Sequence, residues 1–185
     1  MGRRKTLRSE LQARAVERDG YVTSQDADRL GMPVAEFDRL VAEGRLTTVS
    51  AGLYRLDRMP PGRHCVLAEA LLRLGADAFL SHDAVLALHG LTEQEPDRIR
   101  IGLTSPRRRR RAPQGVELVR DQVPADELTC YQGLRSTTVL RALLDCRRLL
   151  PPAQLAAAAE LAARRGLLLR RERSTVLSAL EPALA

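Results

Sequence analysis

Residues 19–56 constrain the fold more than any other part of the chain, because helix start and stop signals recur there at short intervals. Thr23 has the character of an N-cap residue, and Asp26 follows three positions later, a spacing typical of a capping box. The pattern ends at Gly31, and Pro33 is then placed as the first residue of another helix. Two short helices joined by so tight a turn predict a helix-turn-helix.

The residues on either side extend this unit. Residues 7–18 have apolar side chains at helical spacing, which predicts a helix before the pair. After the pair, residues 45–49 and 53–56 are strand-like runs, and Gly52 stands between them where a hairpin turn requires positive φ. The third helix has the apolar stripe Val34, Phe37, Leu40 and Val41. Three helices followed by a hairpin predict a winged helix-turn-helix with its third helix presented to a groove.

The stretch Met-Pro-Pro-Gly at residues 59–62 predicts a stiff linker between two domains. We expect an α+β protein with a winged helix-turn-helix domain at 1–58 and a mixed helix and strand domain at 62–185 that ends in helices. The second part is predicted to contain helices at 65–74, 81–89, 139–150 and 152–166 and strands at 99–103 and 116–119. Ser81 is predicted to cap the second of these helices, and His89 to bond its terminal carbonyls.

Charge and cysteine content limit the class of protein only loosely. The net charge is +7, yet Lys5 is the only lysine, so 29 of the 30 basic residues are arginine. Arginine enrichment of this kind is typical of a GC-rich genome and weakens the argument for a polyanionic partner. The three cysteines form no Cys-x-x-Cys pair, and no long apolar segment is present. We therefore expect a cytoplasmic protein without membrane insertion.

Enzymatic and metal sites are not indicated. His82 and His89 lie seven residues apart with Asp83 adjacent, a spacing that suits a capped helix better than metal ligation. Pro96-Asp97 resembles the start of a metal-dependent nuclease motif, but no carboxylate occurs in 99–103 and no lysine follows Lys5. We expect no enzymatic activity, no metal and no cofactor.

A series of motifs, taken in order, resembles a known family. GYVTSQDADRLG, LVAEGRL and GLYRL are similar to the N-terminal winged helix of AbiEi-type antitoxins, and FLSHDAVLALHGL and GLRSTTVLRALLD are similar to segments of the domain that follows. The resemblance extends over residues 19–145. It implies a type IV antitoxin that represses its own operon by binding operator DNA and counteracts a co-encoded nucleotidyltransferase toxin. The alternative is a stand-alone winged-helix regulator whose second domain dimerises or senses a ligand.

Basic residues of the first domain are the candidate DNA contacts. The third helix carries Glu36, Asp38 and Glu43 against Arg39 alone, so a protein-binding role for the winged helix is the alternative. Arg39 is the candidate for a base edge, because guanidinium groups pair bidentately with guanine. The full set of predicted DNA-binding residues is Arg3, Arg4, Lys5, Arg8, Arg39, Arg45 and Arg55.

A run of five arginines gives the second domain its highest charge density. Arg107, Arg108, Arg109, Arg110 and Arg111 follow one predicted strand and precede the next. Two interpretations are open. The run is a solvated loop, since like charges repel, or it contacts an acidic partner or a nucleic-acid backbone.

Overall fold

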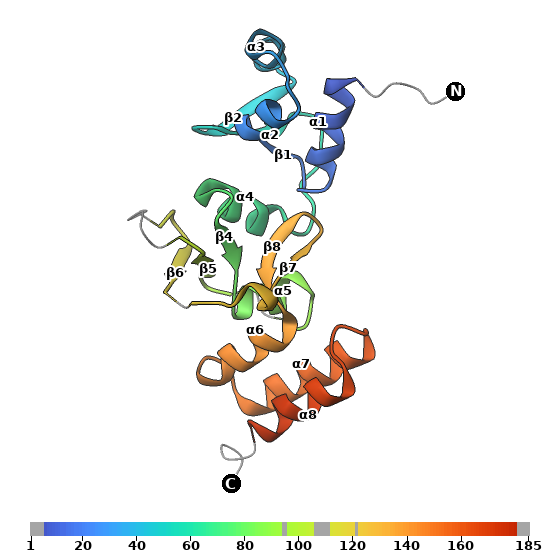
Figure 1. Ribbon diagram of the computed structural model, residues 1–185, viewed down its shortest axis with the longest axis vertical. Coiled ribbons are helices and arrows are strands. Elements are labelled where there is room, and N and C mark those ends of the chain that lie inside the picture. Colours follow the sequence, from blue (N-terminus) through green and yellow to red (C-terminus); the bar gives the residue numbers. More distant parts are fainter. Residues whose placement is uncertain (1–5, 94–95, 106–111, 121, 181–185) are drawn as a thin grey trace, which may run out of the picture. The chain divides into compact units, whose positions relative to one another are not determined.

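The computed structural model describes residues 6–93, 96–105, 112–120 and 122–180. The chain divides into two compact units, Met1–Ala76 and Asp77–Ala185. Both contain helices and strands, so the predicted α+β class is confirmed (Figure 1).

The first unit is a winged helix-turn-helix followed by one more helix. Its three strands form an antiparallel sheet in the order β1-β3-β2. Its core is formed by apolar residues from every helix of the winged helix and from the sheet, among them Leu11, Val22, Phe37, Leu40 and Leu46. The elements are α1 (Leu7–Val16), β1 (Tyr21–Thr23), α2 (Ser24–Arg29), α3 (Val34–Ala42), β2 (Leu46–Ser50), β3 (Leu53–Leu56) and α4 (Cys65–Leu74).

The local signals in the sequence act largely as predicted. Thr23 is the N-cap of α2, and both hydrogen bonds of the capping box with Asp26 are present. Gly52 has φ +74° in the turn between β2 and β3, and its carbonyl accepts a hydrogen bond from the backbone N–H of Ser24 at 3.0 Å. The hairpin is therefore tied to the start of α2. Pro33 is the N-cap of α3 and not its first residue, a shift of one position.

Helix α4 belongs to the first unit. The Tyr21 hydroxyl on β1 donates a hydrogen bond to Glu69 on α4 at 2.7 Å and lies 3.3 Å from the sulfur of Cys65. Burial, together with these two neighbours, raises the pKa of Tyr21, so the phenol keeps its proton and acts as the donor. The first unit thus continues past the linker at 59–62 to Ala76.

The second unit is built on a mixed five-stranded sheet in the order β6-β5-β4-β8-β7. Strands β4 and β5 are antiparallel, as are β7 and β8, whereas the pairs β4 with β8 and β5 with β6 are parallel. Helices α6, α7 and α8 pack against one another after the last strand (Figure 1). The elements are β4 (Ala78–Leu80), α5 (Asp83–Leu88), β5 (Ile99–Leu103), β6 (Val116–Val119), η1 (Ala125–Glu127), β7 (Leu128–Tyr131), β8 (Leu134–Thr137), α6 (Val139–Asp145), η2 (Cys146–Arg148), α7 (Pro152–Arg164) and α8 (Arg170–Ser178).

Two predictions for the second unit need correction, namely the cap at Ser81 and the extent of the helix at 139–150. Ser81 does not cap α5, because its N–H and its hydroxyl both donate to the Arg100 carbonyl, at 3.0 and 3.4 Å. The N-cap is His82, whose φ of +54° turns the chain sharply into the helix. At the other end of α5, Arg165 donates to the carbonyls of His89 and Gly90 at 2.8 and 3.1 Å. The predicted helix at 139–150 is divided into α6 and the 3-10 turn η2.

Helices long and apolar enough to cross a membrane are absent from the described part of the chain.

Candidate nucleic-acid interface

Helix α3 has one buried and one exposed face. Phe37 and Leu40 are buried in the core. The ring of Phe37 packs edge-on against that of Tyr54 on the wing, with the two ring centroids 4.9 Å apart. The opposite face carries Arg39, whose side chain is 64% exposed. Val34, predicted as part of the apolar stripe, is 71% exposed at the start of the helix. The buried stripe therefore fixes the helix against the wing and directs Arg39 outward.

Three arginines meet at the C-terminal end of α3. The carboxylate of Glu43 lies 3.1 Å from Arg45, 3.5 Å from Arg39 and 3.8 Å from Arg8. Arg8 comes from the start of α1 and Arg45 precedes β2, so the cluster joins three different parts of the fold. Three of the predicted DNA contacts are thus brought together around one acid.

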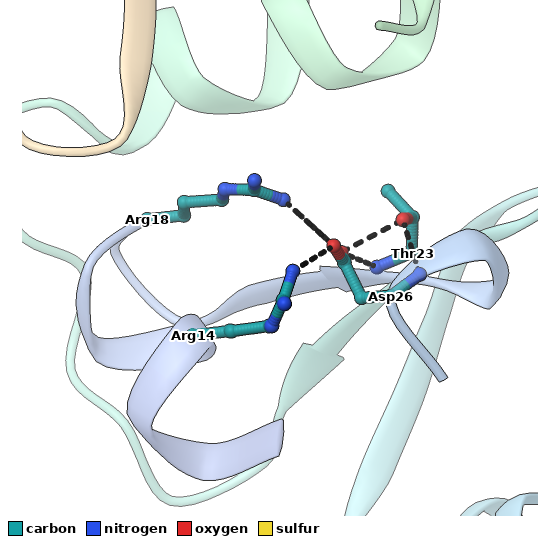
Figure 2. Close-up of polar contacts among 4 residues, drawn as sticks. All are labelled: Arg14, Arg18, Thr23 and Asp26. Atoms are coloured by element: carbon teal, nitrogen blue, oxygen red, sulfur yellow. Dashed lines mark hydrogen bonds and ion pairs between the residues drawn. The ribbon is translucent and has the colours of Figure 1, made fainter. Parts of the chain in front are cut away.

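Asp26 is the centre of a second polar cluster in the helix-turn-helix. Its side chain is only 1% exposed, and its carboxylate accepts hydrogen bonds from the Thr23 N–H at 2.9 Å and hydroxyl at 2.7 Å. Arg14 on α1 and Arg18, just after the end of that helix, reach the same carboxylate at 3.3 and 3.0 Å (Figure 2). Asp26 thereby connects α1 to the start of α2.

The environment of Asp26 determines its protonation state. Burial alone would raise the pKa of this carboxyl group. The hydrogen bonds from Thr23 and the charges of Arg18 and Arg14 outweigh that effect and lower the pKa below its ordinary value. Asp26 is therefore a carboxylate at neutral pH and binds both arginines as an anion.

Arg55 is engaged within its own unit. One guanidinium nitrogen donates to the Met59 carbonyl at 2.8 Å, and the group lies 5.8 Å from the centre of the Tyr21 ring. Arg55 thus packs toward the linker at the base of the wing. Of the remaining predicted contacts, Arg3, Arg4 and Lys5, and the run at 107–111, lie outside the described residues.

A groove of about 830 Å³ adjoins the arginine cluster. Its lining is mostly apolar and also includes the charged side chains of Arg8, Glu43 and Arg45 and residues of the linker. The lining residues are Arg8, Leu11, Gln12, Val16, Leu40, Glu43, Gly44, Arg45, Leu46, Leu56, Asp57, Arg58, Met59 and Pro60.

The second unit contains a separate charged network. Arg100 on β5 pairs with Asp83 and, at 3.3 Å, with Glu117 on β6, and all three line a hollow of about 580 Å³. His82 accepts or donates one hydrogen bond with Ser81 at 3.1 Å, and the His89 ring lies 4.3 Å from that of Tyr131. Groups of three or more side chains able to hold a metal ion do not occur among the described residues.

The sequence interpretation missed two acidic positions. The sequence predicts Asp26 only as a cap residue, although Arg14 and Arg18 are four residues apart in the helix predicted at 7–18 and indicate a shared acceptor. Glu43 was counted only as an unfavourable charge. Its role depends on Arg8, which is distant in sequence and adjacent only after folding.

Comparison with known proteins supports the regulator interpretation of the first unit. Residues 9–56 match the family model described as a transcriptional regulator, AbiEi antitoxin, which confirms the resemblance predicted for this segment. The family is one of regulatory antitoxins. No curated protein matches the chain.

One solved structure, the RV2827C protein from Mycobacterium tuberculosis, is 21% identical to this chain. The alignment covers 97% of this chain and 79% of that one, with a TM-score of 0.47.

Proposed function

We propose that the first unit binds duplex DNA upstream of its own gene and represses transcription there. In this proposal α3 enters the major groove while the wing and the start of α1 contact the flanking backbone. The observation that supports it is the meeting of Arg8, Arg39 and Arg45 at the exposed end of α3.

The three arginines have different roles in the proposal. Arg8, from the start of α1, and Arg45, from just before β2, bind phosphates, and these contacts position the protein without reading sequence. Arg39 is directed away from the core and reaches a base edge, with guanine as its preferred partner. Arg3, Arg4 and Lys5 add phosphate contacts from the N-terminal arm. Arg55 contacts a phosphate from the wing only if its guanidinium group exchanges the hydrogen bond to the Met59 carbonyl for one to DNA.

We further propose that the second unit counteracts a co-encoded nucleotidyltransferase toxin. This proposal rests on the order of its sequence motifs, FLSHDAVLALHGL and GLRSTTVLRALLD, within the resemblance to AbiEi-type antitoxins. Arg107 to Arg111 are the proposed contacts for an acidic partner. The two activities are proposed to separate between the two compact units.

DNA binding is tested by fluorescence anisotropy with a labelled duplex of the upstream region and an unrelated duplex of equal length. We expect preference for the upstream duplex. Its affinity should fall by orders of magnitude between about 50 and 200 mM salt if six or more phosphates are contacted. Equal and weak binding to both duplexes would instead favour a protein-binding winged helix.

Toxin neutralisation is tested by growth rescue during expression of the neighbouring gene, alongside a promoter reporter. Replacement of Arg39 and Arg45 by alanine should abolish repression and leave rescue intact. Replacement of Arg107 to Arg111 by alanine should have the opposite effect. A chain without a neighbouring nucleotidyltransferase gene would be a stand-alone regulator.

A further inference from the structure

Glu43 is the point on which the basic residues of the proposed DNA-binding surface converge. Its carboxylate pairs with Arg8, Arg39 and Arg45, which are 39%, 64% and 59% exposed, and is itself 42% exposed. The acids Glu36 and Asp38 stand on the same helix, but the ion pairs that the described residues form at α3 all involve Glu43. This acid is therefore distinguished by its partners and not by its charge alone.

We propose that the Glu43 carboxylate occupies, in the free protein, the site that a backbone phosphate of DNA takes in the complex. This inference rests on the proposed function. On binding, Arg8 and Arg45 exchange the carboxylate for a phosphate, and Arg39 is released toward the base edges.

The chemistry of the cluster suits such an exchange. Carboxylate and phosphate oxygens both accept charge-assisted hydrogen bonds from guanidinium groups, often in pairs. Arginines from α1, from α3 and from the start of β2 are already gathered within 3.8 Å of one anion, so little rearrangement is needed to receive another. Exposed ion pairs are weak, which makes the carboxylate easy to displace.

Glu43 therefore opposes DNA binding in two ways. Its pairs with the arginines must break before those groups bind phosphate, and its negative charge then stands close to the incoming backbone. The protein with Glu43 should bind more weakly, and release fewer counterions, than one without this charge.

The experiment compares full-length Glu43→Gln, Asp38→Asn and unaltered protein on the upstream duplex across a salt series. Asp38→Asn is the matched control because it removes one exposed negative charge from the same helix and Asp38 has no arginine partner among the described ion pairs. We expect Glu43→Gln to bind roughly three- to tenfold more tightly at low salt. Its plot of log affinity against log salt should be steeper by about 1, because the variant presents one more net positive charge to the same phosphates. Asp38→Asn should give a smaller gain and an unchanged slope.

A third variant identifies the arginines responsible. Combining Glu43→Gln with Arg8→Ala and Arg45→Ala should remove the gain in affinity. Thermal unfolding of each variant checks that the first unit remains folded.

The outcomes separate this inference from the function on which it rests. Weaker binding by Glu43→Gln, or equal gains from Glu43→Gln and Asp38→Asn, would overturn the phosphate-site proposal while leaving DNA binding intact. Absence of duplex preference in the unaltered protein would overturn the proposed function and this inference with it.

Discussion

Replacement of Asp26 by asparagine tests whether one buried carboxylate holds the helix-turn-helix together. The substitution keeps the size of the side chain and one acceptor oxygen, so the cap to the Thr23 N–H can persist. It removes the negative charge that binds Arg14 and Arg18. The side chain of Asp26 is 1% exposed, so solvent does not replace the lost interactions on its side.

The expected loss of stability follows from the exposure of the partners. Removing one member of a fully buried pair costs about 3–5 kcal/mol. The side chains of Arg14 and Arg18 are 35% and 21% exposed and recover part of their hydration. We therefore expect Asp26→Asn to lower the free energy of unfolding of the first unit by about 2–3 kcal/mol. In a unit of this size, that corresponds to a fall in Tm of roughly 10–20 °C.

Amide hydrogen exchange with mass spectrometry measures the two units separately in the full chain. Peptides from β1 and β3 of the variant should exchange about 30- to 150-fold faster, the equivalent of 2–3 kcal/mol. Peptides from β8 and α6 serve as the internal reference and should be unchanged.

Two further variants complete this test. Asp28→Asn removes an exposed charge from the same helix and should change exchange less than threefold, an effect of roughly 0.5 kcal/mol. Arg18→Gln combined with Asp26→Asn should cost less than the sum of the two single changes, because both break the same pair. Equal effects of Asp26→Asn and Asp28→Asn would refute the reasoning, since the buried ion pairs would then contribute nothing.

Three other predictions concern pH, packing and thiol reactivity. Folding lowers the pKa of Asp26, so the stabilisation from its carboxylate is complete above the unfolded pKa of about 3.9 and is lost as pH falls through the folded pKa. The difference in free energy of unfolding between the unaltered protein and Asp26→Asn, measured by urea unfolding, should therefore become smaller below about pH 4. Gly102→Ala places a methyl group 2.2 Å from the Phe79 ring and should destabilise the second unit by about 1–3 kcal/mol in the same exchange assay, with Phe79→Leu partly restoring it. Burial, with Asp83 and Asp145 nearby, raises the pKa of Cys146 to about 12. Mass spectrometry should therefore find the exposed Cys130 alkylated at pH 8 long before Cys146. Comparable alkylation rates of the two thiols would contradict the burial of Cys146.

The sequence by itself determined the elements whose signals are local. The capping box of Thr23 and Asp26, the turn at Gly52 and the apolar stripe of α3 each depend on residues within a few positions of one another. The cap hydrogen bonds of Thr23 and Asp26 and the positive φ of Gly52 are formed by nearby backbone and side-chain groups, so they are predictable without the tertiary contacts. The winged helix was predictable for this reason.

The tertiary structure decided the short strands and the ion-pair partners. β1 and β4 have only three residues each. β1 is a strand because it pairs with β3, and β4 because it pairs with β5 and β8, and all of these partners are distant in sequence. Likewise Glu43 is an unfavourable acid in the sequence interpretation. It becomes the centre of a three-arginine cluster because folding brings Arg8 of α1 within 3.8 Å of it. Strand pairing and charge pairing depend on which surfaces folding brings within a few ångströms, and that is a property of the packed core rather than of neighbouring residues.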